Sequence, residues 1–268
     1  LEMIEFFILT VSGIFIGSLI GMFGIGGGLF IVPVVTYVLI GFHDYSFNDA
    51  LIIGIVSSLA SIILSGFIAT ISHHINKNID WYIVRKFIFG VFIGSTLIGF
   101  YLPYISINFI RYTFIFYTFF AAYKILFPRI VFKNRLPMLF VHSNLLGLCF
   151  ASLSGLIGIG GGSLFVPYLT SKGIPIKLSI GIASCLGLFI GLCSSITILL
   201  SWGPILFNNQ AHMLGLIYLP AIIFLTIPSL IFVKFSADWL QKISDKNIRR
   251  GFACLLIFIG FLMLLKNQ

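Results

Sequence analysis

The sequence contains few charged residues: 9% of its 268 residues are Asp, Glu, Lys or Arg, whereas 59% are apolar. A soluble domain carries about 25% charged residues, so this chain cannot cover a water-facing surface. The composition excludes a soluble enzyme and a disordered chain, and it excludes a nucleic-acid-binding protein despite the net charge of +9. We therefore predict an all-α polytopic membrane protein, with residues 1–268 forming a single transmembrane domain.

The apolar segments also lack acidic residues. All seven carboxylates lie in terminal or loop positions: Glu2, Glu5, Asp44, Asp49, Asp80, Asp238 and Asp245. Cation pumps and proton relays usually need intramembrane carboxylates, so their absence disfavours a cation substrate. The four cysteines lie in apolar runs without pairing or metal-ligand spacing, and we expect neither a metal nor a cofactor.

Glycine clusters interrupt the apolar segments twice. The segments are residues 6–20, 29–41, 50–71, 82–101, 107–127, 137–157, 163–171, 178–201, 214–234 and 249–265. A full membrane span needs about 20 apolar residues. Two segments, 29–41 and 163–171, are too short, and each follows a glycine cluster. We predict two broken helical hairpins, whose irregular backbone must be buried in protein or face a wet cavity.

The sequence contains an internal repeat. Residues 17–33 align with residues 151–167, and ten of the 17 aligned positions are identical. Further along the chain, residues 54–59 match residues 181–186. We do not expect such agreement by chance. The repeat predicts a duplicated unit, with repeat 1 at about 1–134 and repeat 2 at about 135–268.

The positive charges predict that the two repeats are inverted. If each hairpin returns to the side on which it started, three spans remain per repeat, and this odd number turns the second repeat upside down. The loops at 73–86, 124–135, 172–177 and 234–250 then share one face and hold 14 of the 16 Lys and Arg. A single crossing by each hairpin would leave only nine there. Because cytoplasmic loops are enriched in Lys and Arg, we predict inversion, with both termini outside.

Inverted repeats with discontinuous helices place a binding site near the membrane midplane. Each glycine cluster precedes a short helix, whose unpaired N–H groups and positive dipole end favour an anion. The predicted substrate-binding residues are Gly26, Gly27, Gly28, Ser57, Ser58, Gly160, Gly161, Gly162, Ser184 and Cys185. The predicted helix breaks and hinges are Gly24, Pro33, Gly158 and Pro167. The alternative is that these glycines and hydroxyls only permit close helix packing.

Two other functions stay open at this point. Ser154 with His142 or His212 suggests an intramembrane hydrolase, although Ser-Gly is a common dipeptide. A passive anion channel would have the same composition as a carrier. Asn144 is interpreted as a hydrogen-bonding contact to a neighbouring helix and not as a site residue.

The paired Gly-Ile-Gly-Gly-Gly…Val-Pro motifs at 24–33 and 158–167 resemble the sulfite exporter TauE/SafE family of membrane transporters. Residues 54–59 and 181–186 look like that family's Gly-Thr-Ser-Leu stretch, and the regions 78–81 and 215–220 also fit. The resemblance covers essentially the whole chain. It implies a bacterial inner-membrane transporter of small sulfur-containing anions, such as sulfite, sulfoacetate, thiosulfate or aryl sulfonates.

Two residues depart from the family's pattern. Ser57 and Ser184 replace the usual Thr, and Cys185 replaces the following Ser in the second copy. We expect a secondary transporter of a small anion, not an enzyme, that works by alternating access in a lipid bilayer. Proton coupling is common for such carriers, but the sequence assigns no carboxylate to it.

Overall fold

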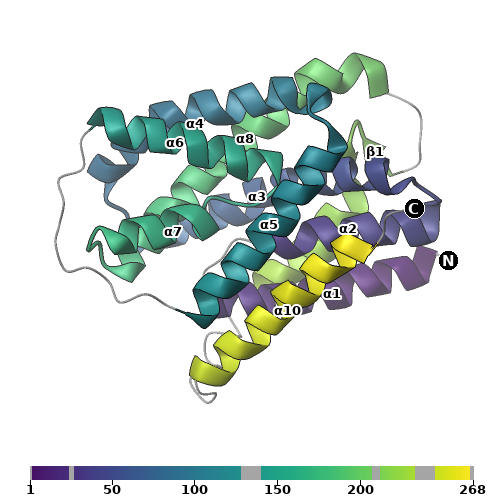
Figure 1. The fold of residues 1–268 in the computed structure, drawn as a ribbon, viewed down its shortest axis with the longest axis horizontal. Helices are drawn as coiled ribbons and strands as arrows, with labels where there is room; N and C mark the ends of the chain where they lie inside the picture. Colours follow the sequence, from purple (N-terminus) through teal and green to yellow (C-terminus); the bar gives the residue numbers. More distant parts are fainter. Residues whose placement is uncertain (1, 24–26, 128–139, 207–211, 233–244, 266–268) are drawn as a thin grey trace.

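The chain is almost entirely helical in a computed structural model that describes residues 2–23, 27–127, 140–206, 212–232 and 245–265 (Figure 1). The α-helices are α1 (Glu2–Phe23), α2 (Gly28–His43), α3 (Phe47–Ile75), α4 (Trp81–Tyr101), α5 (Ile107–Leu126), α6 (Phe140–Leu156), α7 (Gly162–Ser171), α8 (Ile176–Leu206) and α10 (Asp245–Leu265). The shorter elements are the 3-10 helix η1 (Leu102–Tyr104), the strands β1 (Met213–Leu214) and β2 (Ile217–Tyr218), and the π-helix η2 (Ala221–Thr226).

Three of the described helices are long and apolar enough to cross a membrane: Phe47–Ile75, Trp81–Tyr101 and Ile176–Ser201. Helix α3 has 29 residues and therefore extends over about 44 Å, more than the roughly 30 Å of a hydrocarbon core. The helix starts are fixed locally. Ser46 Oγ accepts a hydrogen bond from Asp49 N at the start of α3, and Asp80 accepts from Tyr82 N and Ile83 N at the start of α4.

Helices α3 and α8 pack against each other between two flanking groups (Figure 1). Helix α4 packs on α6 and α8 on one side of the molecule, and α2 packs on α3 on the other side. Helices α5 and α10 lie side by side and run diagonally across the bundle. The two central helices are antiparallel, because Gly66 of α3 lies against Leu188 while Gly191 of α8 lies against Leu59.

Glycines bring the helices of the two halves into backbone contact. A Cβ at Gly13 of α1 would overlap the carbonyl group of Leu225, and a Cβ at Gly147 of α6 would meet the carbonyl oxygen of Phe87 at 2.7 Å. Gly13 and Gly147 occupy the same position in the two sequence repeats. Each half therefore places the first arm of its hairpin against the other half, and small residues at such interfaces allow close approach.

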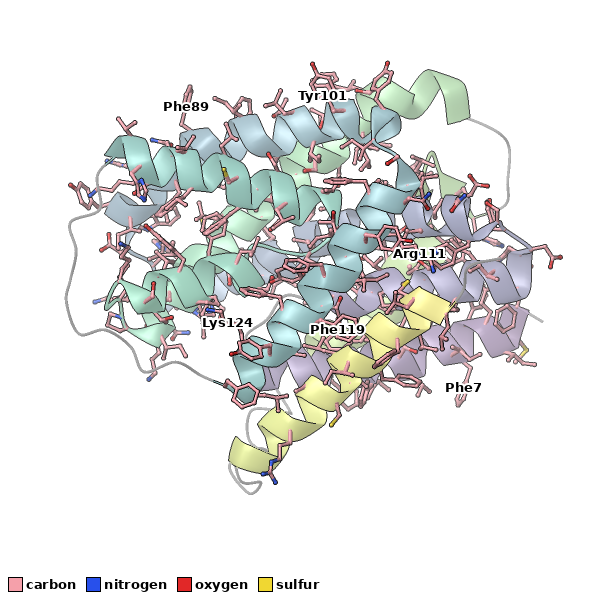
Figure 2. The ribbon with its side chains drawn as sticks, in the orientation of Figure 1. Phe7, Phe89, Tyr101, Arg111, Phe119 and Lys124 are labelled. Carbon is pink, nitrogen blue, oxygen red and sulfur yellow. The ribbon has the colours of Figure 1, made fainter. Side chains whose placement is uncertain are left out.

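Large apolar side chains cover the outside of the bundle. Phe7, Phe89 and Tyr101 are exposed and point away from it, as lipid-facing side chains do (Figure 2). The described charges separate toward two ends. One end carries Lys77, Lys86, Lys124, Lys177 and Arg250, and the opposite end carries Glu2, Glu5, Asp44, Asp49 and Arg111.

The prediction of one continuous apolar span at 214–234 is wrong. Strands β1 and β2 pair antiparallel with Met213 opposite Tyr218, and the two-residue turn uses Gly215 at φ +60°. Pro220 then precedes the π-helix. Apolar composition alone does not separate a short strand from a helix, and a π-helical turn has no sequence signature of this kind.

Candidate functional site

The two broken hairpins open toward opposite ends of the molecule. In the first, Glu5 of α1 lies 3.2 Å from His43 at the end of α2, so the two arms are antiparallel and return to the acidic end. In the second, Phe150 of α6 stacks edge-on against Phe165 and Tyr168 of α7, with ring centroids 5.2 and 5.8 Å apart. That hairpin returns to the basic end, since Gly181 near the start of α8 contacts Asn78.

The glycine-rich ends of the two hairpins meet in the interior. A Cβ at Gly28 would overlap the carbonyl oxygen of Gly158 and would lie 2.9 Å from Ser58 Oγ. The Ser58 hydroxyl donates a buried hydrogen bond of 2.7 Å to the same Gly158 carbonyl. Gly158 has a φ of +67°, which favours glycine, and a Cβ there would also lie 3.0 Å from the Cα of Ile55. We call this contact of Gly28, Ser58 and Gly158 the tip junction.

The second hairpin also contacts α8 beyond the tip junction. A Cβ at Gly161 would lie 3.2 Å from Gly187 N and 3.3 Å from the carbonyl oxygen of Ala183. Ser184 and Cys185 belong to this part of α8. The Ser184 hydroxyl donates to the Ile180 carbonyl of its own helix at 2.9 Å, and Cys185 is buried.

Both short helices begin where the sequence predicted. Gly27 and Gly161 are their N-caps, without a side-chain cap, and Gly160 precedes Gly161 in non-helical backbone. Helix α7 begins at Gly162. Pro33 lies inside α2 and Pro167 at the same position inside α7. The remaining predicted site residues, Gly24 and Gly26, lie outside the described residues.

Ser57 is engaged in a different contact from Ser58. Its hydroxyl oxygen accepts a 2.9 Å hydrogen bond from the backbone N–H of Tyr218 in β2. One turn further along α3, Ser61 Oγ accepts from the Thr226 hydroxyl at 2.9 Å. Ser57 and Ser61 therefore attach α3 to the segment 213–232, while Ser58 contacts the second hairpin.

A buried polar cluster at the acidic end was missed by the sequence analysis. The Tyr218 hydroxyl donates to Glu5 Oε1, and His43 Nε2 lies 3.2 Å from each Glu5 oxygen and 3.2 Å from the Tyr218 hydroxyl. The Glu5 side chain is only 2% exposed, although it lies in the first turn of α1. The prediction that terminal carboxylates are solvated is therefore wrong for Glu5. A signal was present, because Glu5 directly precedes an uninterrupted apolar run.

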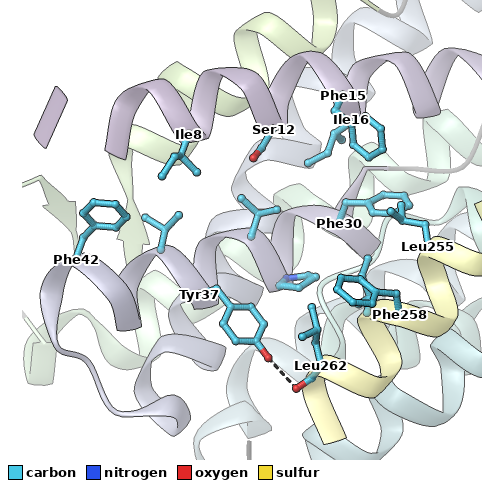
Figure 3. A pocket seen from close by; sticks show the side chains of 14 residues that line it. Ile8, Ser12, Phe15, Ile16, Phe30, Tyr37, Phe42, Leu255, Phe258 and Leu262 are labelled. Carbon is cyan, nitrogen blue, oxygen red and sulfur yellow. Dashed lines mark hydrogen bonds between the residues drawn. The ribbon is translucent and has the colours of Figure 1, made fainter. Parts of the chain in front are cut away.

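A cavity of about 470 Å³ lies between α1, α2 and α10 (Figure 3). Its lining is almost wholly apolar, with Phe15, Phe30 and Phe258 among its side chains. The hydroxyl of Tyr37 at its edge donates to the Leu262 carbonyl at 2.7 Å. An oxyanion would lose its hydration here without gaining donors, so this cavity does not suit one. Within the described ranges, no group of His, Cys, Asp and Glu could hold a metal ion.

The hydrolase candidates do not come together. Ser154 and His142 lie on the same helix, about 18 Å apart along its axis, which is far beyond hydrogen-bond reach. His212 lies 3.9 Å from Glu2 and edge-on to Phe6. Asn144 does contact a neighbouring helix as predicted, since its Oδ1 accepts from Gly90 N of α4 at 3.0 Å.

Comparisons with known proteins identify the family. The sequence profile of the sulfite exporter TauE/SafE family matches residues 9–263. A "probable membrane transporter protein" of Haemophilus influenzae is 32% identical over 259 residues, which cover 95% of this chain and 96% of the relative. A protein with the same description from Methanocaldococcus jannaschii is 26% identical over 96% of this chain and 95% of its own. No solved structure matches significantly. The chain belongs to the sulfite exporter TauE/SafE family of membrane transporters.

Proposed function

We propose that the protein is a secondary transporter of a small anion, a sulfur oxyanion or organosulfonate, with its binding site at the two glycine-rich hairpin ends. The observation that carries the proposal is the tip junction, where Gly28, Ser58 and Gly158 from the two repeats touch. Sulfite, thiosulfate and sulfoacetate are the candidate substrates, a class taken from the family description.

The chemistry of these ends suits an anion without a cationic side chain. Helices α2 and α7 each present an N-terminus capped only by glycine, Gly27 and Gly161. The first N–H groups of a helix have no intrahelical partner, and the dipole places partial positive charge there. Ser154, one turn before the break in the second hairpin, is fully buried, and its hydroxyl has no hydrogen-bond partner among the described residues. It is a further donor for a bound oxyanion.

Alternating access follows from an inverted-repeat arrangement of repeat 1, about 1–134, and repeat 2, about 135–268. Three observations support it: the hairpins open toward opposite ends, their glycine ends meet, and Gly13 and Gly147 make equivalent contacts with the other half. Rocking one hairpin against the other would expose the junction to each side in turn. We place the protein in a bacterial inner membrane as a multi-pass protein, with the basic end cytoplasmic and both termini outside.

The test is counterflow of radiolabelled sulfite and thiosulfate in proteoliposomes, with wild type, Gly161→Val and a matched control, Gly41→Val. A valine at 161 would force the second hairpin away from Ala183 and Gly187, whereas a Cβ at Gly41 meets no atom within 4 Å. We expect saturable counterflow in wild type and Gly41→Val, and none in Gly161→Val. Counterflow by Gly161→Val at the wild-type rate would contradict the site.

A passive anion channel remains the alternative function, and the same assay separates it from a carrier. A carrier binds the anion on one side and returns with a second one, so entrapped unlabelled anion accelerates uptake of the label. A channel shows flux without this acceleration. Absence of flux for every sulfur oxyanion tested would reject the substrate class.

A further inference from the structure

The buried cluster of Glu5, His43 and Tyr218 joins three elements that are far apart in the sequence. Glu5 is on α1, His43 ends α2 and Tyr218 is in β2. Glu5 is 2% exposed and Tyr218 1%, whereas the His43 side chain is 30% exposed. The imidazole therefore lies between the surface and a carboxylate that has no direct access to water.

A carboxylate and an imidazole in hydrogen-bond contact form a proton-binding pair. Histidine is the side chain that changes charge between about pH 5 and 8 when unperturbed. Two groups this close titrate as a unit, so the pair as a whole gains or loses each proton. Burial makes the number of protons energetically important, because an unpaired charge in a low-dielectric interior is costly.

The other charged and titratable groups at this end are arranged around the pair. Glu2 on α1 lies 3.9 Å from His212, in the segment before β1. Asp44, Tyr45 and Asp49 follow His43 between α2 and the first turn of α3. Arg111 of α5 donates to the carbonyls of Met263 and Leu264 in α10. These groups set the surrounding field, but none of the hydrogen bonds just given involves Glu5.

The cluster is connected to the tip junction through one residue. The side chain of Tyr218 bonds to Glu5, and its backbone N–H bonds to Ser57 Oγ. The next residue of α3, Ser58, donates to the Gly158 carbonyl at the junction. A change in the bond between Tyr218 and Glu5 therefore acts on a strand that is attached to the same turn of α3 as the junction.

We propose that the Glu5–His43 pair is the proton-binding site of this carrier, and that its protonation is coupled through Tyr218 and Ser57 to anion binding at the tip junction. The inference rests on the proposed function and names its coupling ion. Protonation transfers no electrons: a proton from water passes through the His43 imidazole to the Glu5 carboxylate and leaves by the same route. Protonation of Glu5 turns the acceptor of the Tyr218 hydroxyl into a neutral carboxyl group, which weakens that hydrogen bond.

The test compares two assays on purified full-length protein in proteoliposomes. Thiosulfate is the probe because it remains a dianion near neutral pH and carries no proton of its own. Counterflow at equal pH on both sides needs no net proton movement, whereas accumulation driven by an imposed pH gradient does. For Glu5→Gln, which keeps size and hydrogen bonding, we expect counterflow to persist and gradient-driven accumulation to fall at least about tenfold. An entrapped pH dye should report the same loss.

Matched variants distinguish the pair from its surroundings. Glu2→Gln removes a carboxylate that is 73% exposed on the same helix and should accumulate thiosulfate as wild type does. Tyr218→Phe keeps the backbone bond to Ser57 and should shift the pH profile of transport while counterflow persists. Accumulation by Glu5→Gln equal to that of wild type would overturn the inference. Loss of counterflow in a folded Glu5→Gln protein would also overturn it, because Glu5 would then serve the fold or the anion.

Failure of the proposed function would have a different signature. If wild type shows no thiosulfate counterflow, that function fails for this anion, and infrared difference spectroscopy on acidification still tests the proton site. A carboxyl C=O band that titrates in wild type and is absent in Glu5→Gln would support the pair as a proton-binding site. A wild-type protein without such a band would overturn it.

Discussion

At the scale of single residues, the two neighbouring serines of α3 have different partners and so different expected roles. Ser58 bonds to the hairpin of repeat 2 and Ser57 to the backbone of β2. The sequence treats the two positions alike, as hydroxyls near a glycine motif. Successive residues on a helix point about 100° apart, so adjacent hydroxyls necessarily face different neighbours.

Ser58→Ala should weaken the tip junction. The substitution removes a buried hydrogen bond worth about 1 kcal/mol and leaves the Gly158 carbonyl without that donor. We expect a lower thermal unfolding temperature in detergent together with reduced counterflow. The control is Ser65→Ala, since Ser65 bonds only to carbonyls of its own helix among the contacts described. Equal effects of the two substitutions would contradict a special role for Ser58.

Gly28→Ala tests the contact between the hairpins more severely. The added methyl group would overlap the Gly158 carbonyl, a backbone atom that cannot rotate away. Overpacking of this kind costs about 1–3 kcal/mol. We expect counterflow to be lost while the protein stays monodisperse on size-exclusion chromatography. Gly41→Ala, with open space around its Cβ, should behave as wild type, and full activity of Gly28→Ala would show that the two ends need not touch.

At the scale of elements, glycine spacing determines how closely the helices approach. Gly90 and Gly94 of α4 are one turn apart and both face α6, where Cβ atoms would overlap the Asn144 and Leu148 carbonyls. The first of these glycines also donates its N–H to the Asn144 side chain. This small-residue stripe sets the distance between the first repeat's α4 and the first arm of the second hairpin.

Gly90→Val should separate α4 from α6 and destabilise the fold as a whole. A branched side chain at this position has no room beside a backbone carbonyl, and the loss should be at least the overpacking cost of about 1–3 kcal/mol. Thermal unfolding followed by tryptophan fluorescence measures it. Gly251→Val is the control, because a Cβ at Gly251 of α10 meets no atom within 4 Å. An unchanged unfolding temperature for Gly90→Val would show that this interface is loose.

The helical hairpins could be predicted from the sequence, but the polar contacts between distant segments could not. The predicted short segments 29–41 and 163–171 agree with α2 and α7 because glycine runs mark the breaks. The burial of Glu5 depends on Tyr218, 213 positions later in the chain, and no local pattern reports such a contact. The bond between Ser57 and β2 failed for a second reason, since the strand itself was predicted as a helix.

At the scale of the whole molecule, the ends of the bundle differ in charge, and this difference orients it. Helix α3 leads from the end with Asp44 to the end with Lys77, and α4 returns to Tyr104. Lys177, at the start of α8, lies at the Lys77 end, since nearby Gly181 contacts Asn78. The segment between the hairpins therefore connects the two ends in a way that fixes which loops must share a side of the membrane.

Single cysteines should react from opposite sides of the membrane according to this arrangement. In a variant without the four native cysteines, we expect Lys77→Cys and Lys177→Cys to react with an impermeant maleimide only in inverted vesicles. Asp44→Cys and Tyr104→Cys should react only in spheroplasts, because Lys- and Arg-rich loops stay in the cytoplasm. The reversed pattern would keep the fold and reject the orientation. Reaction of Lys77→Cys and Lys177→Cys from opposite sides would contradict the inverted repeat itself, since that arrangement requires the loops before α4 and α8 to share one face.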